Sequence, residues 1–587
     1  MNILNKSLLL VLVALSACKI QYQPKITAGE ISATIKALAS DEFQGRKPGL
    51  PGDSLAANFV ADKFKKSGIK MLYSRGFQPV TLITGFQFGS DNHLSSGNHT
   101  FALSTDYEPL FFSANKSFSG KLAIAGYGMT ISTDSLKWDD YQNLQANNHW
   151  VLIFEGVPGH LQQNKVVKKY SDLRSKVLNA IDHHASGILI VSTDFNTKGV
   201  TKTAMFDKNS TPYSVPVLKI AQKTADIILG NKQPFSEIEN KIKTDQKPFF
   251  NLTEIDVIGE ASVLPKITIA HNIVGMLPGR DPKLAGEFVV VGAHYDHLGY
   301  GGQGSGSRMP DSIAVHHGAD DNASGVAAVI ELAQRFSHEK NNRRSIVFIA
   351  FTAEESGLIG SRAFVSDPPF NLKKVSAMFN FDMVGRLDSA KDLSIGGVGT
   401  SLEAKALIDS LVHGFNLRIS KEGYGPSDHA SFYGENIPVL YFNTGVHDQY
   451  HTPKDTWDRI NFKGEQMIAE NAYSLIREVA NRDQRLTYQE SGPKVGISNR
   501  TDLKVTLGII PDFVGMEKAG LRIDGVTPGK AASRSGLLKG DIIIAIDGKN
   551  VGSIYDYMAR MKIYSPGDII TVDVMRGAEK KVFLVTL

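Results

Sequence analysis

Two runs of residues in the second half of the chain are apolar almost throughout, and they limit the fold more than any other feature. Residues 288–293 and 345–351 form these runs, and between them residues 326–333 repeat apolar side chains at helical spacing. A strand without a polar face is buried on both sides, as in a parallel sheet covered by helices. The strand–helix–strand order therefore predicts an α/β fold with a mixed, mainly parallel sheet.

Side chains that suit metal ions follow the predicted strands. His294 and Asp296 are two residues apart in an extended segment, so they project to one face, where a carboxylate commonly orients a ligating imidazole. The segment 318–325, which contains Asp320 and Asp321, opens a helix after a loop. Ligands of α/β proteins gather at the edge of the sheet where such loops lie.

Two further groups of acids and a histidine complete the pattern. Glu354 and Glu355 follow the run 345–351, and one of them can bind a metal while its neighbour stays free as a base. Asp382 follows another apolar stretch, and His451 lies further along. Alone, each group has an ordinary structural explanation, such as a helix cap or a charged first turn. Their order and their places at strand ends together predict a metal site.

Composition narrows how such a metal is held. The 587 residues include a single cysteine, which excludes a disulfide framework and a Cys-rich zinc site, so His, Asp and Glu must supply the ligands. The formal net charge of +4 gives no reason to expect nucleic acid or a polybasic membrane patch.

The first eighteen residues have the pattern of an export signal. Lys6 precedes an apolar run, residues 8–15, that is too short to span a bilayer. The run ends in Leu15-Ser16-Ala17-Cys18, which resembles the lipobox of bacterial lipoproteins. This resemblance implies cleavage that leaves Cys18 as a lipidated first residue. We therefore expect an exported protein anchored by lipid to a bacterial membrane, on its periplasmic or cell-surface face.

The chain is long enough for several domains. Short strands replace the helix-rich texture after about residue 105, and short strands with glycine turns return after about 490. The expected parts are a signal segment (1–18), a first catalytic segment (24–104), an inserted β-rich domain (105–248), a second catalytic segment (249–490) and a C-terminal module (495–587).

The site motifs resemble those of the co-catalytic zinc metallopeptidases of the bacterial leucyl aminopeptidase and glutamate carboxypeptidase type (clan MH). The matching segments are His294-x-Asp296, 321–325, Glu354-Glu355, Asp382, 427–432 and 450–452. The resemblance implies a phosphorylase/hydrolase-like α/β fold and two Zn²⁺ ions, although cobalt or manganese suits the same ligands.

The resemblance also implies a role for each residue. One zinc ion would take His294 and Asp382, the other Glu355 and His451, and Asp321 would bridge them; Asp320 is the rival for the bridge. Asp296 would orient His294, Glu354 would act as general base, and a cis peptide bond would follow Asp321. We expect His297, His316 and His317 to line the surrounding loops and Asp428 and His429 to support the pocket.

Two accessory parts have resemblances of their own. The insert resembles a protease-associated (PA) domain. The C-terminal module resembles a β-barrel-like PDZ domain, with a carboxylate-binding loop near 519–523 and a groove helix at 554–561. Such a groove takes the C-terminus of a peptide as an added strand.

The functional expectation is an aminopeptidase acting on peptides. A carboxypeptidase or dipeptidase of the same family, a glutaminyl cyclase with one zinc ion, and a non-catalytic peptide-binding lipoprotein stay open as alternatives. The pair Glu354 and Glu355 argues against the last, because a scaffold has no need of a base.

Overall fold

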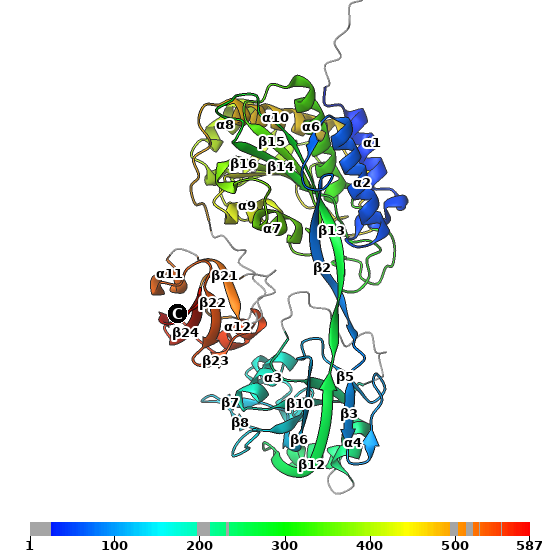
Figure 1. Cartoon of the computed structure of the whole chain (residues 1–587), viewed down its shortest axis with the longest axis vertical. Helices are drawn as coiled ribbons and strands as arrows, with labels where there is room; N and C mark the ends of the chain where they lie inside the picture. The colour runs from blue at the N-terminus through cyan, green and yellow to red at the C-terminus, as the bar shows by residue number, and fades with distance from the viewer. Residues whose placement is uncertain are drawn as a thin grey trace, which may run out of the picture.

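The computed structural model describes residues 25–195, 212–230, 234–492, 503–511, 520–526, 529–552 and 554–587. Cys18 and the expected signal segment lie outside these residues. Within them, no helix is both long enough and apolar enough to cross a bilayer. Figure 1 shows the described chain as two larger units joined by a pair of long strands, with a smaller module beside them.

The catalytic candidate residues belong to the unit built on a nine-stranded sheet of the described chain, ordered β1-β13-β15-β14-β16-β19-β17-β18, with β2 also paired to β13. Its centre is four parallel strands, as the apolar runs predict, and antiparallel pairs lie on both sides. The central strands are β14 (Phe288–His294), β15 (Ser345–Phe351), β16 (Val375–Phe381) and β19 (Val439–Asn443). The outer strands are β1 (Lys70–Met71), β13 (Val263–Leu277), β17 (Asp392–Gly396) and β18 (Asn416–Ile419).

Helices cover both faces of this sheet, which explains why its central strands have no polar face. One face packs against a large apolar core shared by α1 (Ala28–Leu38), α2 (Pro51–Lys66), α6 (Gly325–Glu339), α8 (Ala404–Leu411) and α10 (Phe462–Asn481). The other face packs against α7 (Ile359–Ser366) and α9 (His429–Gly434), with Phe364 and Phe432 fully buried there.

The inserted unit is connected through a ribbon of two strands. β2 (Phe77–Phe88) and β13 pair antiparallel from Phe77–Ile273 to Phe88–Val263. Between them the chain forms an eight-stranded sheet, ordered β4-β3-β12-β6-β9-β10-β11-β5. Its strands are β3 (His93–Ser96), β4 (His99–Thr100), β5 (Tyr107–Pro109), β6 (Lys116–Ala125), β9 (His149–Phe154), β10 (Gly187–Ser192), β11 (Val217–Ala221) and β12 (Phe250–Ala261).

The inserted sheet is wider than the expected boundaries of 105–248. β3 and β4 precede residue 105, and β12 follows residue 248, where the sequence analysis expects catalytic segments. β12 alternates exposed and half-buried residues, so it lacks the uniformly apolar pattern that marks the central strands. The helix α3 (Leu173–Asp182) covers one face of this sheet.

The C-terminal module is a small antiparallel sheet with two short helices. Its strands are β20 (Ile509–Pro511), β21 (Leu521–Val526), β22 (Ile542–Ile546), β23 (Lys549–Asn550), β24 (Ile569–Arg576) and β25 (Glu579–Thr586), and its helices are α11 (Ala531–Ser535) and α12 (Ile554–Met561). The expected groove helix 554–561 is α12. Of the expected carboxylate loop, residue 519 lies outside the described chain and residues 521–523 begin β21.

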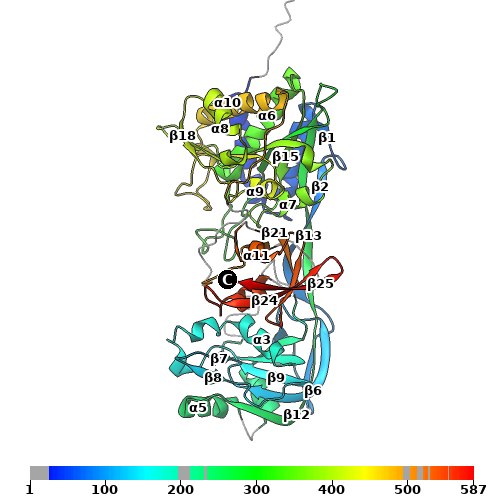
Figure 2. The ribbon, with the colours of Figure 1, turned by 90° about the vertical axis from the view of Figure 1, so that its left-hand side faces the viewer.

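This module packs on the insert through α12. Arg560 donates to both carboxylate oxygens of Asp182 at the end of α3, with N–O distances of 2.6 and 2.8 Å. Both views show the module between the two larger units (Figures 1 and 2).

Candidate metal centre

The candidate ligands meet at the carboxyl ends of the central parallel strands. His294 is the last residue of β14, Glu355 lies four residues after β15, and Asp382 directly follows β16. Asp321 lies in the turn before α6, and His451 lies in the loop between β19 and α10. Neighbouring parallel strands end at one edge of a sheet, so residues far apart in sequence converge there.

Asp321 faces two separate groups of ligands with its two oxygens. Its Oδ1 lies 3.4 Å from His294 Nε2, and Asp382 Oδ1 also lies 3.4 Å from that nitrogen. Its Oδ2 lies 3.1 Å from His451 Nε2, which is also 3.2 Å from Glu355 Oε2. A carboxylate that bridges two metal ions requires this placement of its two oxygens. The peptide bond from Asp321 to Asn322 is cis, as the resemblance implies.

These separations fit metal ions of the size of zinc. Two ligand atoms that bind one tetrahedral zinc ion at about 2.0–2.1 Å lie about 3.3 Å from each other. The four distances above cluster around that value, and the ligands are almost entirely buried. Each group contributes one histidine and one carboxylate besides Asp321, which leaves coordination positions free for water and substrate.

The ligand group that contains Glu355 and His451, called the second group here, has a further nitrogen donor, His297. Its Nδ1 lies 2.9 Å from Glu355 Oε1 and 3.8 Å from Asp321 Oδ2, so His297, Asp321 and Glu355 also form a cluster compact enough for an ion. His297 contacts the Glu355 oxygen that faces away from His451. We therefore interpret it as a donor that orients Glu355, a contact the sequence analysis missed by placing His297 in the loop lining.

Asp320 lies with its side chain outside both groups. Its Oδ1 accepts the backbone N–H of Gly385 at 2.7 Å, and its Oδ2 lies 3.3 Å from His447 Nε2. The contacts of Asp321 with both groups favour it as the bridge over Asp320.

Asp296 and Glu354 are connected beside the first group. Asp296 Oδ1 accepts the backbone N–H of Glu354 at 3.0 Å and lies 3.6 Å from His294 Nδ1, which is closer, at 3.2 Å, to the backbone oxygen of Asp296. The carboxylate of Asp296 thus fixes the loop of Glu354 as well as lying beside the imidazole. Glu354 Oε2 lies 3.9 Å from His294 Nε2, next to the first group without belonging to it.

The contacts of two buried acids, Glu354 and Asp321, give them opposite protonation preferences. Burial raises the pKa of Glu354 well above its usual value; the charge of His294 opposes this rise, and those of Glu355 and Asp428 add to it. Burial also acts to raise the pKa of Asp321, but the contacts with His294 and His451 outweigh it and hold that pKa well below the usual value. Asp321 thus stays ionised, as a ligand must, while Glu354 has a high proton affinity, as suits a group that takes up a proton.

Two buried residues hold the loops of the site from behind. Arg46 is fully buried and donates to the backbone oxygens of Leu38, Tyr295, His317 and Gly318 at 2.6–2.8 Å. Asp455 Oδ2 accepts the backbone N–H groups of Asp320 and Asp321 at 3.0 and 3.1 Å. No local sequence pattern around Arg46 or Asp455 points to these contacts.

The other expected pocket residues lie around the centre. His316 Nε2 contacts Ser307 Oγ at 2.8 Å, and His317 Nε2 contacts Asp41 Oδ1 at 2.8 Å, so neither faces the two groups. Asp428 is fully buried, and the ring of His429 stacks on that of Tyr441.

Comparison with known families agrees with this geometry. Residues 272–476 match the model of peptidase family M28, and residues 502–587 match the PDZ domain. The chain carries a peptidase family M28 domain followed by a PDZ domain. The M28 match includes every candidate ligand and both candidate catalytic residues.

Several curated relatives of this chain are named aminopeptidases. A "Probable leucine aminopeptidase 1" of Trichophyton verrucosum (strain HKI 0517) is 30% identical over 210 residues, which are 33% of this chain and 53% of that protein. "Aminopeptidase YwaD" of Bacillus subtilis (strain 168) is 28% identical over 227 residues, 37% of this chain and 46% of that protein. The chain thus spans about half the length of these relatives. Among solved structures, an aminopeptidase from Aneurinibacillus sp. strain AM-1 is similar at a TM-score of 0.44 and 24% identity, over 80% of this chain and 97% of that chain.

Proposed function

We propose that this protein is a zinc-dependent aminopeptidase that hydrolyses N-terminal residues from peptides. The observation that carries the proposal is the position of Asp321, whose two oxygens face two complete ligand groups beside Glu354. The M28 domain and the names of its relatives support the same reaction class.

The site residues divide the work of amide hydrolysis. His294, Asp321 and Asp382 would hold one zinc ion, and Asp321, Glu355 and His451 the other. Bound zinc would polarise the scissile carbonyl and make a water molecule nucleophilic near neutral pH. Glu354 takes the proton of the attacking water on its carboxylate and passes it to the leaving nitrogen. One such acid–base group typically contributes about 10²–10⁴-fold to the rate.

The high proton affinity of Glu354 serves both halves of this transfer. Burial and the neighbouring acids raise the pKa of Glu354, so its carboxylate is a stronger acceptor for the proton of the attacking water than a carboxylate of ordinary pKa. The surrounding carboxylates would also attract the free α-ammonium group of a peptide, which favours an aminopeptidase over a carboxypeptidase.

An activity screen with metal analysis on the same sample tests the proposal. The chain from Gln21 is offered aminoacyl-anilides, N-acetylated peptides, C-terminally blocked peptides and a peptide with N-terminal glutamine. We expect about two zinc ions per chain and cleavage only where the amino terminus is free. Cleavage of N-acetylated peptides would favour a carboxypeptidase, cyclisation with one zinc ion a glutaminyl cyclase, and metal without turnover a binding protein.

The variant Glu354→Gln separates chemistry from metal binding. We expect it to keep its metal and lose about 10²–10⁴-fold in kcat. Glu331→Gln is the matched control, because Glu331 is also a buried acid of this domain but lies on α6, next to Thr27. A Glu354→Gln variant as active as this control would contradict the role of the base.

We also propose that the protein is exported and anchored by lipid on Cys18, and that its PDZ groove takes peptide C-termini. The lipobox pattern supports the first statement. The second is supported by α12, whose Tyr557 and Met561 share a core with the strands of the PDZ domain. Cys18→Ser in a cell fractionation experiment is expected to move the protein from the membrane to the soluble fraction.

A further inference from the structure

We propose that the edge of the peptidase sheet opposite the metal centre docks on an anionic phospholipid surface. We call this the basic edge and define it by eight exposed side chains: Lys65, Lys66, Lys70, Arg280, Lys283, Lys340, Lys373 and Lys374. These residues are spread along the sequence, so the near-neutral charge of the whole chain hides them.

The topology brings these residues to one edge. Arg280 and Lys283 precede β14, Lys340 precedes β15, and Lys373 and Lys374 precede β16. These three strands are parallel, so their amino ends lie together. Lys65 and Lys66 end α2, and Lys70 in β1 pairs with Met276 near the end of β13.

Contacts between these segments show that they form one continuous surface. The backbone N–H of Arg280 donates to the oxygen of Asn342 at 3.0 Å, which joins the loops before β14 and β15. The position that a Cβ atom would occupy at Gly286 lies 3.9 Å from Lys374 Nζ. The same position at Gly68 lies 3.3 Å from Ser337 Oγ, at the end of α6. The loop before β16 and the end of α2 thus adjoin the same surface.

Four acids of the loops on this edge have partners, whereas Asp367, in the loop before β16, is exposed and is in no ion pair within the described residues. Asp281 and Asp483 pair with Arg343 at 2.8 and 2.7 Å, Glu287 pairs with Arg344 at 2.8 Å, and Glu339 pairs with Arg335 at 2.9 Å. In the described part of the chain, none of the eight cations that define the basic edge is in an ion pair. The edge therefore presents a positive charge that its own acids do not neutralise.

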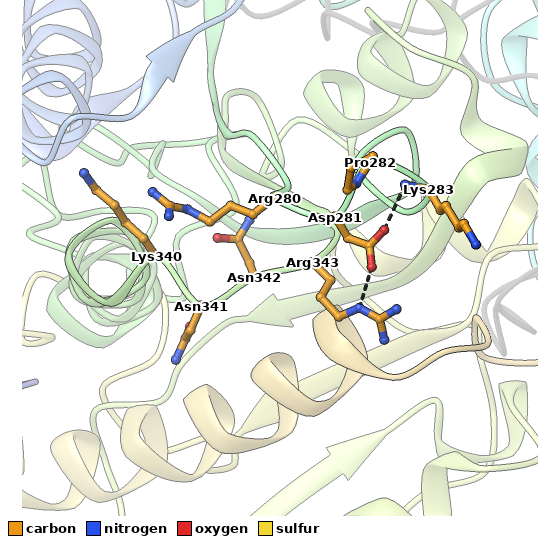
Figure 3. Close-up of a pocket in the computed structure, with 8 residues that line it drawn as sticks. All are labelled: Arg280, Asp281, Pro282, Lys283, Lys340, Asn341, Asn342 and Arg343. Carbon is orange, nitrogen blue, oxygen red and sulfur yellow. Dashed lines mark hydrogen bonds and ion pairs between the residues drawn. The ribbon is translucent and has the colours of Figure 1, made fainter.

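The surface between these loops is hollowed. A shallow pocket of about 700 Å³ is lined by Arg280, Lys283, Lys340 and Arg343 together with their neighbours (Figure 3). Figure 3 shows Arg280 and Lys340 extending toward the same side, while Asp281 is bonded to Arg343. Guanidinium and ammonium groups around an open hollow suit the phosphate of a lipid headgroup.

The position of the N-terminus points to a membrane as the occupant. The backbone N–H of Thr27 lies 3.4 Å from Glu331 Oε2 on α6, and Lys340 lies nine residues further along, or about 14 Å at the rise of a helix. Residues 18–24, fully extended, reach at most about 25 Å. A lipid on Cys18 is thus within reach of a bilayer that touches the basic edge.

Docking in this way would also orient the metal centre. The centre lies at the carboxyl ends of the strands whose amino ends form the basic edge, and β14, from Phe288 to His294, is about 20 Å long. The protein would therefore hold its metal centre on the side turned away from the headgroups.

Sedimentation with vesicles tests the proposal, using the chain from Gln21, which keeps every described residue but lacks Cys18. The lipid anchor belongs to the proposed function above, so this assay tests the basic edge independently of the anchor.

The vesicles contain phosphatidylcholine alone or with 30% phosphatidylglycerol, at about 50 mM salt. The test variant is Lys283→Gln, Lys340→Gln, Lys373→Gln and Lys374→Gln combined. The control combines Lys137→Gln, Lys243→Gln, Lys247→Gln and Lys266→Gln, four exposed lysines outside the edge. Both changes remove four positive charges.

We expect binding to the vesicles with phosphatidylglycerol and weaker binding at higher salt. Each lysine near an anionic surface contributes up to roughly fivefold to partitioning, so four together contribute up to about 600-fold. We expect the test variant to bind at least about 20-fold more weakly and the control to bind within about twofold of the unmodified chain. Peptidase activity should be equal in all three proteins. Equal loss in test and control, equal binding to both kinds of vesicle, or displacement from vesicles by a few millimolar inorganic phosphate would each overturn the proposal; the last would indicate a small-anion pocket instead.

Discussion

The two large sheets of the molecule share a plan but differ at the ends of their strands. The peptidase sheet and the inserted sheet each have a centre of parallel, fully buried strands, such as β15 and β10. In the first, the strands end in histidines and acids that face one another. In the second, the end of β9 lies beside Lys176, whose ammonium donates to the backbone oxygens of Phe154 and Gly156. Parallel strands supply a place for a site, and the loop residues decide whether it carries chemistry.

The comparison predicts its largest effect at the bridging carboxylate. Asp321→Asn removes one negative charge shared by both ligand groups, so both should lose metal and peptidase activity should fall by about 10⁴-fold or more. Metal content and kcat/KM measured on one preparation check this. If the variant kept two ions, the bridging assignment would be wrong.

A smaller loss is expected from the residue that holds the loop of Asp321. Asp455→Ala leaves two backbone N–H groups without their acceptor, and outer contacts of this kind are worth about 10–100-fold in metal affinity or activity. Competition with a chelator measures the affinity. Asp458→Ala, an exposed acid nearby, is the control and should be silent.

A substitution at Lys176, beside a strand end of the inserted sheet, should change the stability of the protein and leave its activity unchanged. Lys176→Met takes two donors from backbone oxygens, and each buried group left unpaired costs about 1–3 kcal/mol. We expect a lower midpoint in urea for the unfolding of the insert, followed by limited proteolysis. Peptidase kcat/KM should stay within about twofold; a large loss of activity would show that the insert takes part in catalysis.

The last prediction concerns Glu331, a buried acid of the peptidase unit that lies outside the metal centre and should affect only the pH dependence of stability. Burial raises the pKa of Glu331 to about 8, and the charge of Glu30 adds to the rise. Because the folded pKa lies above the unfolded value, the favourable contribution is full below pH 4.5 and lost as the pH rises through 8. Glu331→Gln should therefore stabilise the protein at pH 9, by at most about 5 kcal/mol, and leave its stability unchanged at pH 4. Thermal melts at both pH values check this, and an equal gain at both would contradict it.

The sequence predicts the parts of the fold that follow from local pattern. The almost wholly apolar run 345–351 is β15 to the residue. The helix 554–561, which the resemblance to a PDZ domain predicts, is α12. The sheet to which β12 belongs cannot be predicted in this way, because its alternating residues are typical of any half-exposed strand. The ligand set is recognisable because the chemistry requires given residue types beside the strand ends.

Contacts between distant segments are beyond the reach of sequence patterns. Arg46 donates to the oxygens of Tyr295 and Gly318, and Asp455 caps N–H groups at 320 and 321. Nothing local to Arg46 or Asp455 shows these partners. The basic edge is hidden for the same reason, since its lysines come from segments between residues 65 and 374 that only the sheet brings together.

The ribbon of β2 and β13 has a consequence for how the protein is made. α1 and α2 complete a core whose other helices, α6, α8 and α10, all follow the insert in the chain. The N-terminal segment therefore leaves the ribosome or translocon well before its partners, and it must wait while residues 89–262 emerge. The insert is a continuous segment that can fold meanwhile, so the unit that starts first finishes last. During that interval the apolar faces of α1 and α2 lack the later helices that cover them in the folded protein.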